Sequence, residues 1–172
     1  MGLRPGRSIR TLERPYTRVS KAVPRKSYVV GVPFPKTHQF EMGSKTGNFD
    51  AILYAVARDG VQIRDAALEA ARIVSHRFLE SKIGATNYFM KLLVYPHQVI
   101  REKPIATGAG ADRYSQGMAR SFGKPVTSAV RTKEGERLVE IRVHKTNLEV
   151  AKTAIRKFGL KISTPVRIEV VE

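Results

Sequence analysis

The chain has 172 residues, of which 42% are apolar, and this is enough for one folded domain with a hydrophobic core. Its 31 Lys and Arg against 15 Asp and Glu give a net charge of +16, so the expected partners are polyanions, either nucleic acid or an anionic membrane surface. The absence of cysteine excludes disulfide bonds, thiolate metal sites and thiol nucleophiles. No apolar run approaches the ~20 residues of a membrane span, and the first ten residues lack the apolar core of a signal peptide. We therefore expect a soluble, cytoplasmic protein.

Residues 1–36 are predicted to form a basic, extended N-terminal arm. They carry nine Lys and Arg against a single acid, Glu13, and so hold +8 of the net charge in about a fifth of the chain. Five prolines interrupt helices, and the segment has too little apolar surface to fold alone. We expect it to be mobile in the free protein and ordered on RNA, with a solvated tail as the alternative. The predicted RNA-binding residues of the arm are Arg4, Arg7, Arg10, Arg14, Arg18, Lys21, Arg25, Lys26 and Lys36.

A single α+β domain is predicted over residues 37–172, with two helices packed on mostly antiparallel strands. Residues 37–42 alternate in polarity and residues 52–56 are apolar, so both are predicted strands. A helix is predicted over residues 62–82, ended by Gly84, with Arg72 away from the centre of its apolar stripe. That stripe, at spacings of three and four, is Ile63, Ala67, Ala70, Val74 and Phe78.

The second half of the domain shows the same mixture of strands and one helix. Two β-rich runs cover residues 88–95 and 98–103. Residues 126–131 and 137–144 flank a turn at 132–136 and are predicted to pair as a β-hairpin. A helix over residues 148–158 is predicted to begin at the N-cap Asn147, and a last strand covers residues 166–171. The inner stripe of this helix is Leu148, Ala151, Ile155 and Phe158.

Residues 101–125 are predicted to form a long internal loop with no apolar stripe of its own. A loop of about 20 residues is uncommon in a compact domain and is usually functional or disordered. Glycines let the backbone approach a phosphate, Lys and Arg contact phosphates, and aromatic rings stack on unpaired bases. An RNA-inserting loop is therefore favoured over a merely flexible one. Its candidate RNA-binding residues are Arg101, Lys103, Gly108, Gly110, Arg113, Tyr114, Arg120, Phe122 and Lys124.

Enzymatic interpretations of this loop find weak support. Gly108 and Gly110 begin like a dinucleotide-binding fingerprint, but Arg113 occupies the third glycine position and no clear helix follows. Gly123 and Lys124 are followed by Pro125, where a P-loop has Ser or Thr. The four histidines lack metal-ligand spacing, and no nucleophile–base set stands out. We expect no catalytic residue, metal or cofactor.

Four stretches carry a resemblance to a known family: MGLRPGR at 1–7, YVVGVPFPKTHQFEMG at 28–43, QIRDAALEAARIVSHRFLE at 62–80 and AGADRYSQGMARSFGKP at 109–125. With them, the sequence resembles the universal large-subunit ribosomal protein family called L-sixteen in bacteria and L-ten-e in archaea, and specifically its archaeal and eukaryotic branch. The resemblance runs along essentially the whole chain. It implies a structural, rRNA-binding component of the large ribosomal subunit.

The resemblance also implies partners and places for the two basic segments. Residues 1–36 would thread among rRNA helices, and residues 101–125 would approach the peptidyl transferase centre and the tRNA acceptor arms. The implied partners are large-subunit rRNA, 5S rRNA nearby, aminoacyl-site tRNA and neighbouring large-subunit proteins, with no membrane and no homo-oligomer. Because RNA performs the catalysis there, the chain would position tRNA and would not be an enzyme.

Two other classes of function remain open at this point. An RNA-modifying enzyme outside the ribosome would require a pocket for a cofactor such as S-adenosylmethionine. A membrane-surface or scaffold protein would use the basic arm on anionic lipid. That arm would then form an amphipathic helix, which its five prolines disfavour.

Overall fold

The structure is a computed structural model that describes residues 4–12, 22–23, 25 and 29–171. The strands among these residues form two antiparallel sheets. The larger sheet has five strands in the order β1 (Glu41–Gly43), β4 (Tyr88–Leu92), β7 (Arg137–Val143), β2 (Ala51–Ala57) and β8 (Val166–Val171). The smaller sheet has three strands in the order β3 (Val61–Arg64), β6 (Lys124–Thr132) and β5 (Gln98–Glu102).

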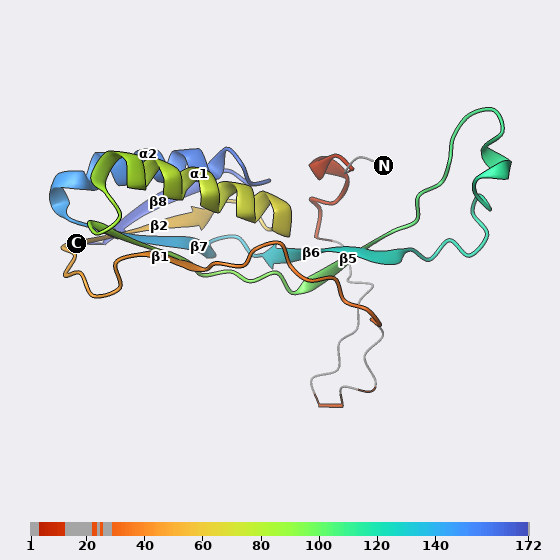
Figure 1. Cartoon of the computed structure of the whole chain (residues 1–172), viewed down its shortest axis with the longest axis horizontal. Helices are drawn as coiled ribbons and strands as arrows, with labels where there is room; N and C mark the ends of the chain where they lie inside the picture. Colours follow the sequence, from red (N-terminus) through yellow and green to blue (C-terminus); the bar gives the residue numbers. More distant parts are fainter. Residues whose placement is uncertain (1–3, 13–21, 24, 26–28, 172) are drawn as a thin grey trace.

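Two helices, α1 (Asp65–Ile83) and α2 (Leu148–Gly159), lie side by side over one face of the five-stranded sheet (Figure 1). The core forms between this helix layer and the sheet, where apolar side chains from alternate strand positions meet the helices. The α+β class predicted from the sequence is thus confirmed. The largest fully buried side chains include Tyr88, Phe158, Leu53, Ile63, Leu68, Leu79, Met90, Leu92, Leu138 and Ile141.

The predicted hairpin of residues 126–144 is wrong, although its turn is present. Gly135 has a φ of +78° and Glu136 N–H donates to the Lys133 carbonyl, as a tight turn requires. The strands on either side then separate: β6 pairs with β3 and β5, whereas β7 pairs with β4 and β2. The chain therefore crosses here from the small sheet to the large one.

The first helix begins later than predicted and exposes a different face. Residues 61–64 form strand β3, so Ile63 is buried in a strand and not in the helix. The buried face of α1 is rotated by one residue, about 100°, from the predicted stripe, and Ala67, Ala70, Val74 and Phe78 are only half-buried. Its buried residues are Asp65, Leu68, Ala71, Arg72, Ser75 and Leu79.

Small residues explain this rotation of α1. Ser75 Oγ donates to the Ala154 carbonyl oxygen of α2 at 3.2 Å, and Ala71 and Ala151 are also fully buried. These short side chains allow the two helices to approach closely. Arg72, predicted to lie outside the stripe centre, is only 7% exposed and donates to both Glu69 and the Gln39 side-chain oxygen.

The other predicted elements differ mainly at their ends. The stripe of α2 is confirmed, with Ala151, Ile155 and Phe158 buried and Leu148 packed against the core. Asn147 occupies the N-cap, but its side chain makes no capping hydrogen bond, because a 3-10 turn at Lys145–Asn147 precedes the helix. Of the predicted strand 37–42, only the end is a strand, and His38 is exposed.

Candidate RNA-binding surface

Strands β5 and β6 form a hairpin whose loop, residues 103–123, is the longest irregular segment of the described chain after residue 29. Glu102 pairs with Lys124 at its base, so the two ends of the loop are adjacent. The loop projects away from the helices along the long axis of the molecule (Figure 1). Contrary to expectation it has some structure of its own, a 3-10 helix at Ala111–Arg113. None of its residues is buried, so it contributes nothing to the core.

Two of the predicted RNA-binding residues act inside the loop. Lys103 Nζ donates to the carbonyl oxygens of Ala119 and Arg120 and so bridges the two sides of the loop. Arg101 donates to the Gly123 carbonyl oxygen at 3.0 Å, and its guanidinium lies 4.6 Å from the centre of the Phe122 ring. Both cations are half-buried, so they brace the base of the loop.

The remaining candidates of the loop are exposed to solvent. Tyr114 is 86% exposed and Phe122 is 65% exposed, so each ring has a face open for stacking. Arg120 adopts a φ of +52°, an uncommon left-handed conformation for a non-glycine residue. The loop therefore presents cations and open aromatic faces together. Its other exposed candidates are Gly108, Gly110, Arg113 and Lys124.

The described beginning of the arm is docked on the body. Residues Gly6–Ser8 form a 3-10 turn, and segment 4–12 lies against β3. The backbone N–H of Gln62 donates to the Arg10 carbonyl at 2.8 Å, and its side chain donates to the Ile9 carbonyl at 2.9 Å. Two of its arginines also form ion pairs, Arg10 with Asp59 at 3.2 Å and Arg4 with Glu102 at 3.8 Å. An independent extended arm therefore does not describe residues 4–12.

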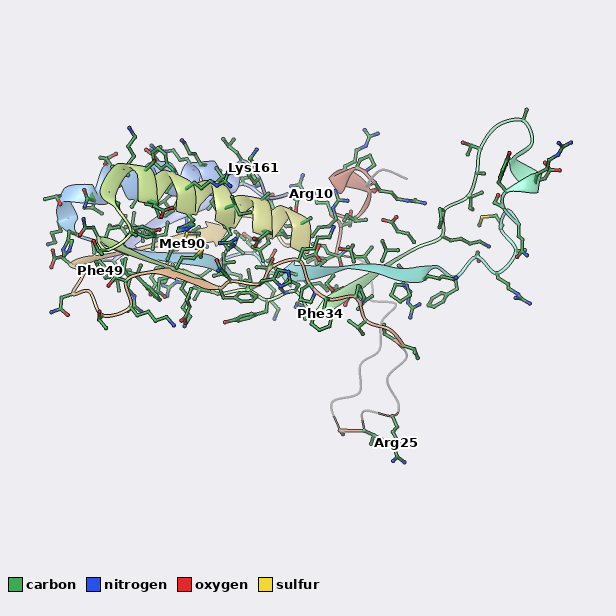
Figure 2. The ribbon with its side chains drawn as sticks, viewed as in Figure 1. Arg10, Arg25, Phe34, Phe49, Met90 and Lys161 are labelled. Atoms are coloured by element: carbon green, nitrogen blue, oxygen red, sulfur yellow. The ribbon has the colours of Figure 1, made fainter. Side chains whose placement is uncertain are left out.

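Of the other candidates in the arm, some are exposed and some lie outside the residues that the structure describes. Arg7, Arg25 and Lys36 are exposed. Near the end of the arm, Phe34 is 92% exposed and points away from the body (Figure 2), and it is an aromatic that the sequence reasoning did not select. Its position between Pro33 and Pro35 was the signal available in the sequence. Four candidates lie outside the described residues: Arg14, Arg18, Lys21 and Lys26.

A buried carboxylate, also missed from the sequence, joins the end of the arm to the loop-bearing strand. Asp65, at the start of α1, is 1% exposed. Its Oδ1 accepts from the Thr127 hydroxyl of β6 at 2.8 Å and from the Ala66 N–H at 2.7 Å. Its Oδ2 accepts from the Lys36 N–H at 3.1 Å. Asp65 therefore holds arm, helix and strand β6 in one arrangement.

The geometry does not support the nucleotide-binding alternatives for this loop. Both fingerprints need a loop between a strand and a following helix, where the helix N-terminus receives the phosphates. Here the glycines lie between two antiparallel strands of one hairpin. Among residues 4–12, 22–23, 25 and 29–171 no group of three or more His, Asp or Glu side chains is arranged to hold a metal ion. Within the same ranges, no helix is long and apolar enough to cross a membrane.

Comparison with known proteins agrees with the resemblance found in the sequence. The family described as ribosomal protein L16p/L10e matches residues 13–169. Three archaeal relatives, each named large ribosomal subunit protein uL16, are similar over nearly the whole chain. The protein of Archaeoglobus fulgidus is 44% identical over 99% of this chain and 94% of its own length, that of Methanocella arvoryzae 45% over 99% and 95%, and that of Methanococcus maripaludis 38% over 100% and 96%. The chain therefore belongs to the ribosomal protein L16p/L10e family.

Proposed function

We propose that this chain is a structural component of the cytoplasmic large ribosomal subunit, where it binds rRNA and helps to position aminoacyl-site tRNA. Family membership supports the ribosomal role, and a +16 charge supports an RNA partner. The partners we propose are large-subunit rRNA, 5S rRNA nearby, aminoacyl-site tRNA and neighbouring large-subunit proteins. Catalysis would belong to the RNA, and the protein would act by placing groups around it.

The loop 103–123 is the observation that carries this proposal. It buries none of its residues and extends away from the body, yet it presents exposed Arg113, Tyr114, Arg120 and Phe122. Such a loop adds no buried residue to the core and offers phosphate contacts and stacking surfaces. We assign the body and arm to rRNA attachment and the loop to the neighbourhood of the tRNA acceptor arm and the peptidyl transferase centre.

Shortening the loop separates attachment from tRNA positioning. The variant keeps Lys103 and replaces residues 105–121 by a few glycines. It also keeps Gly123, because a Cβ at position 123 would come within 2.8 Å of the Glu102 backbone. Loop-closure entropy changes by only ~0.6 kcal/mol for each doubling of length, so the fold should remain nearly as stable. We expect full occupancy in purified large subunits together with slower tRNA accommodation or peptide-bond formation.

A loop of natural length provides the matched control. Arg113→Ala and Arg120→Ala together remove two exposed cations while keeping the length and both aromatic rings. We expect this variant to fall between the wild type and the shortened loop in the rate of peptide-bond formation. Normal activity of fully occupied, shortened-loop subunits would contradict the tRNA-positioning role. Loss of occupancy would show that the loop is instead an rRNA anchor.

A further inference from the structure

A half-open pocket of about 200 Å³ lies between the docked N-terminal segment and the body, outside loop 103–123. Segment 4–12 forms one wall, strand β3 and the start of α1 form the second, and the chain just after α2 forms the third. None of its residues was selected as an RNA-binding candidate from the sequence. The lining residues are Gly6, Ile9, Gln62, Arg64, Ala67, Lys161, Ile162 and Ser163.

Two uncompensated positive charges converge on this pocket. Arg64 comes from the end of β3, and Lys161 follows α2 and is exposed on the helix side of the molecule (Figure 2). Within the part of the chain that the structure describes, neither side chain forms an ion pair with a carboxylate. Arg10, in the same N-terminal segment, is by contrast paired with Asp59. The positive potential of Arg64 and Lys161 is therefore available to an anion.

The other polar groups of the pocket already have partners. Gln62 Nε2 donates to the Ile9 carbonyl, and Ser163 Oγ donates to the Gln62 carbonyl at 3.1 Å. Arg64 Nη1 donates to the Arg4 carbonyl at 2.7 Å, which leaves the other N–H donors of its guanidinium. The donors for an incoming anion thus come from Arg64 and Lys161, while Ile9, Ala67 and Ile162 supply apolar surface.

We propose that this pocket holds a backbone phosphate of large-subunit rRNA between Arg64 and Lys161. A phosphate matches the two cations, because charge-assisted hydrogen bonds from Arg and Lys are the usual protein contacts to backbone phosphates. The inference rests on the proposed ribosomal role and adds a contact region on the body itself. Because segment 4–12 forms one wall, docking of that segment and phosphate binding should favour each other.

Chemical modification of lysines tests the site directly. The protein is treated with an acetylating reagent free, bound to protein-free large-subunit rRNA and within large subunits, and acetylation is measured by mass spectrometry. Lys152 of α2, paired with Glu149, is the internal control. We expect Lys161 to be protected at least several-fold in both complexes and Lys152 to be protected less. Protection only within whole subunits would indicate a protein neighbour and overturn the proposal, as would an unprotected Lys161 in both complexes.

Variants give an independent measurement and separate this inference from the proposed function. Lys161→Ala removes a side chain without a hydrogen bond to the described body, so the fold should be kept. Its affinity for protein-free rRNA should depend less steeply on salt, with the logarithmic slope falling by part of the roughly 0.7–0.9 that one phosphate contact contributes. Arg64→Ala with Lys161→Ala should lower the slope by the whole of that contribution.

The matched control is Arg77→Ala with Lys152→Ala, which removes one arginine and one lysine from the outer helix surface. An equal change of slope in this control, or no change in the pocket variants, would refute the pocket as a phosphate site while leaving the ribosomal role intact. If the wild-type protein bound neither rRNA nor large subunits, the proposed function itself would fail.

Discussion

At the scale of single residues, the side chains that matter most for the arrangement of the surface are hidden inside the protein. Asp65 is a buried carboxylate whose three donors are two backbone N–H groups and one hydroxyl. Its own backbone carbonyl accepts from the Thr37 hydroxyl, so both sides of residue 65 hold the end of the arm. Burying an ionised group is costly unless hydrogen bonds compensate, and here every carboxylate oxygen has at least one.

Replacing this carboxylate by its amide tests the arrangement. In Asp65→Asn one oxygen can still accept from Ala66 and Thr127, but the amide N–H₂ must then face the Lys36 N–H. Two donors oppose each other in a buried place, which costs about 1–3 kcal/mol. We expect the free energy of unfolding to fall by that amount and the Lys36 amide to exchange faster with deuterium.

Asp112→Asn at the exposed tip of the loop is the matched control, because the same chemical change there affects no buried group. It should leave the free energy of unfolding within ~0.5 kcal/mol of the wild type. If the two variants were equally stable, the three hydrogen bonds of Asp65 would not hold the arm in solution.

At the scale of elements, the short edge strand β1 is held on its neighbour β4 by an ion pair in addition to the backbone pairing. Glu41 faces Lys91 across the β1–β4 pair, with 3.0 Å between Oε1 and Nζ, and its other oxygen lies 2.6 Å from Lys45 Nζ. Hydrogen bonding to Lys45, and then to Lys91, lowers the pKa of Glu41 to about 2. The interaction is therefore present above the ordinary pKa of this carboxyl, 4.5, and is lost as the pH falls from there towards 2.

Glu41→Gln should remove the contribution that the Glu41 ion pairs make to the free energy of unfolding, and with it the pH dependence of that contribution. We expect the wild type to be more stable than this variant at pH 6 and low salt, and the difference to shrink as the pH falls from 4.5 to 2. Denaturant unfolding at several pH values measures it. Glu134→Gln, on the exposed turn after β6, is the control. A difference between wild type and Glu41→Gln that stayed constant over this pH range would show that Glu41 does not interact with its lysines in solution.

At the scale of the whole molecule, the chain combines a folded body with basic segments that depend on a partner to different degrees. The five-stranded sheet and two helices contain most of the core, whereas loop 103–123 has no buried residue. Segment 4–12 is intermediate, since hydrogen bonds from Gln62 and Arg64 hold it on β3. We therefore expect the body to be ordered in the free protein, and segment 4–12 and loop 103–123 to become more ordered when RNA binds.

Hydrogen exchange should resolve these degrees of order. In the free protein we expect the amides of strands β2 and β7 to exchange slowly, those of residues 104–123 to exchange fast, and the Gln62 amide, which bonds the Arg10 carbonyl, to be intermediate. In large subunits the loop amides should become protected. Strong protection of residues 104–123 in the free protein would contradict a loop that is ordered by RNA.

Some features of the candidate site could be predicted from local sequence, whereas others depend on contacts between residues far apart in the chain. The exposed cations, glycines and rings of the loop were identifiable from the sequence, because exposure there follows from the lack of an apolar stripe. The bracing roles of Arg101 and Lys103 were not, since they depend on carbonyl groups up to 22 residues away along the chain. Asp65 and the pocket of Arg64 and Lys161 join segments still further apart.

The sequence by itself determined the class of fold, the apolar stripe of α2, the basic N-terminal segment and the long loop, because each depends on composition or on spacing within a few residues. Tertiary structure alone decided which strands pair and which face α1 buries. The turn at 132–136 has the right residues for a hairpin, yet β6 and β7 join different sheets, because pairing depends on partners such as β3 and β4 far along the chain. Likewise α1 buries Ser75 and Arg72 in place of Val74 and Phe78. Ser75 donates to the Ala154 carbonyl of α2 and Arg72 donates to Gln39 before β1, so partners far along the chain decide which face of the helix is buried.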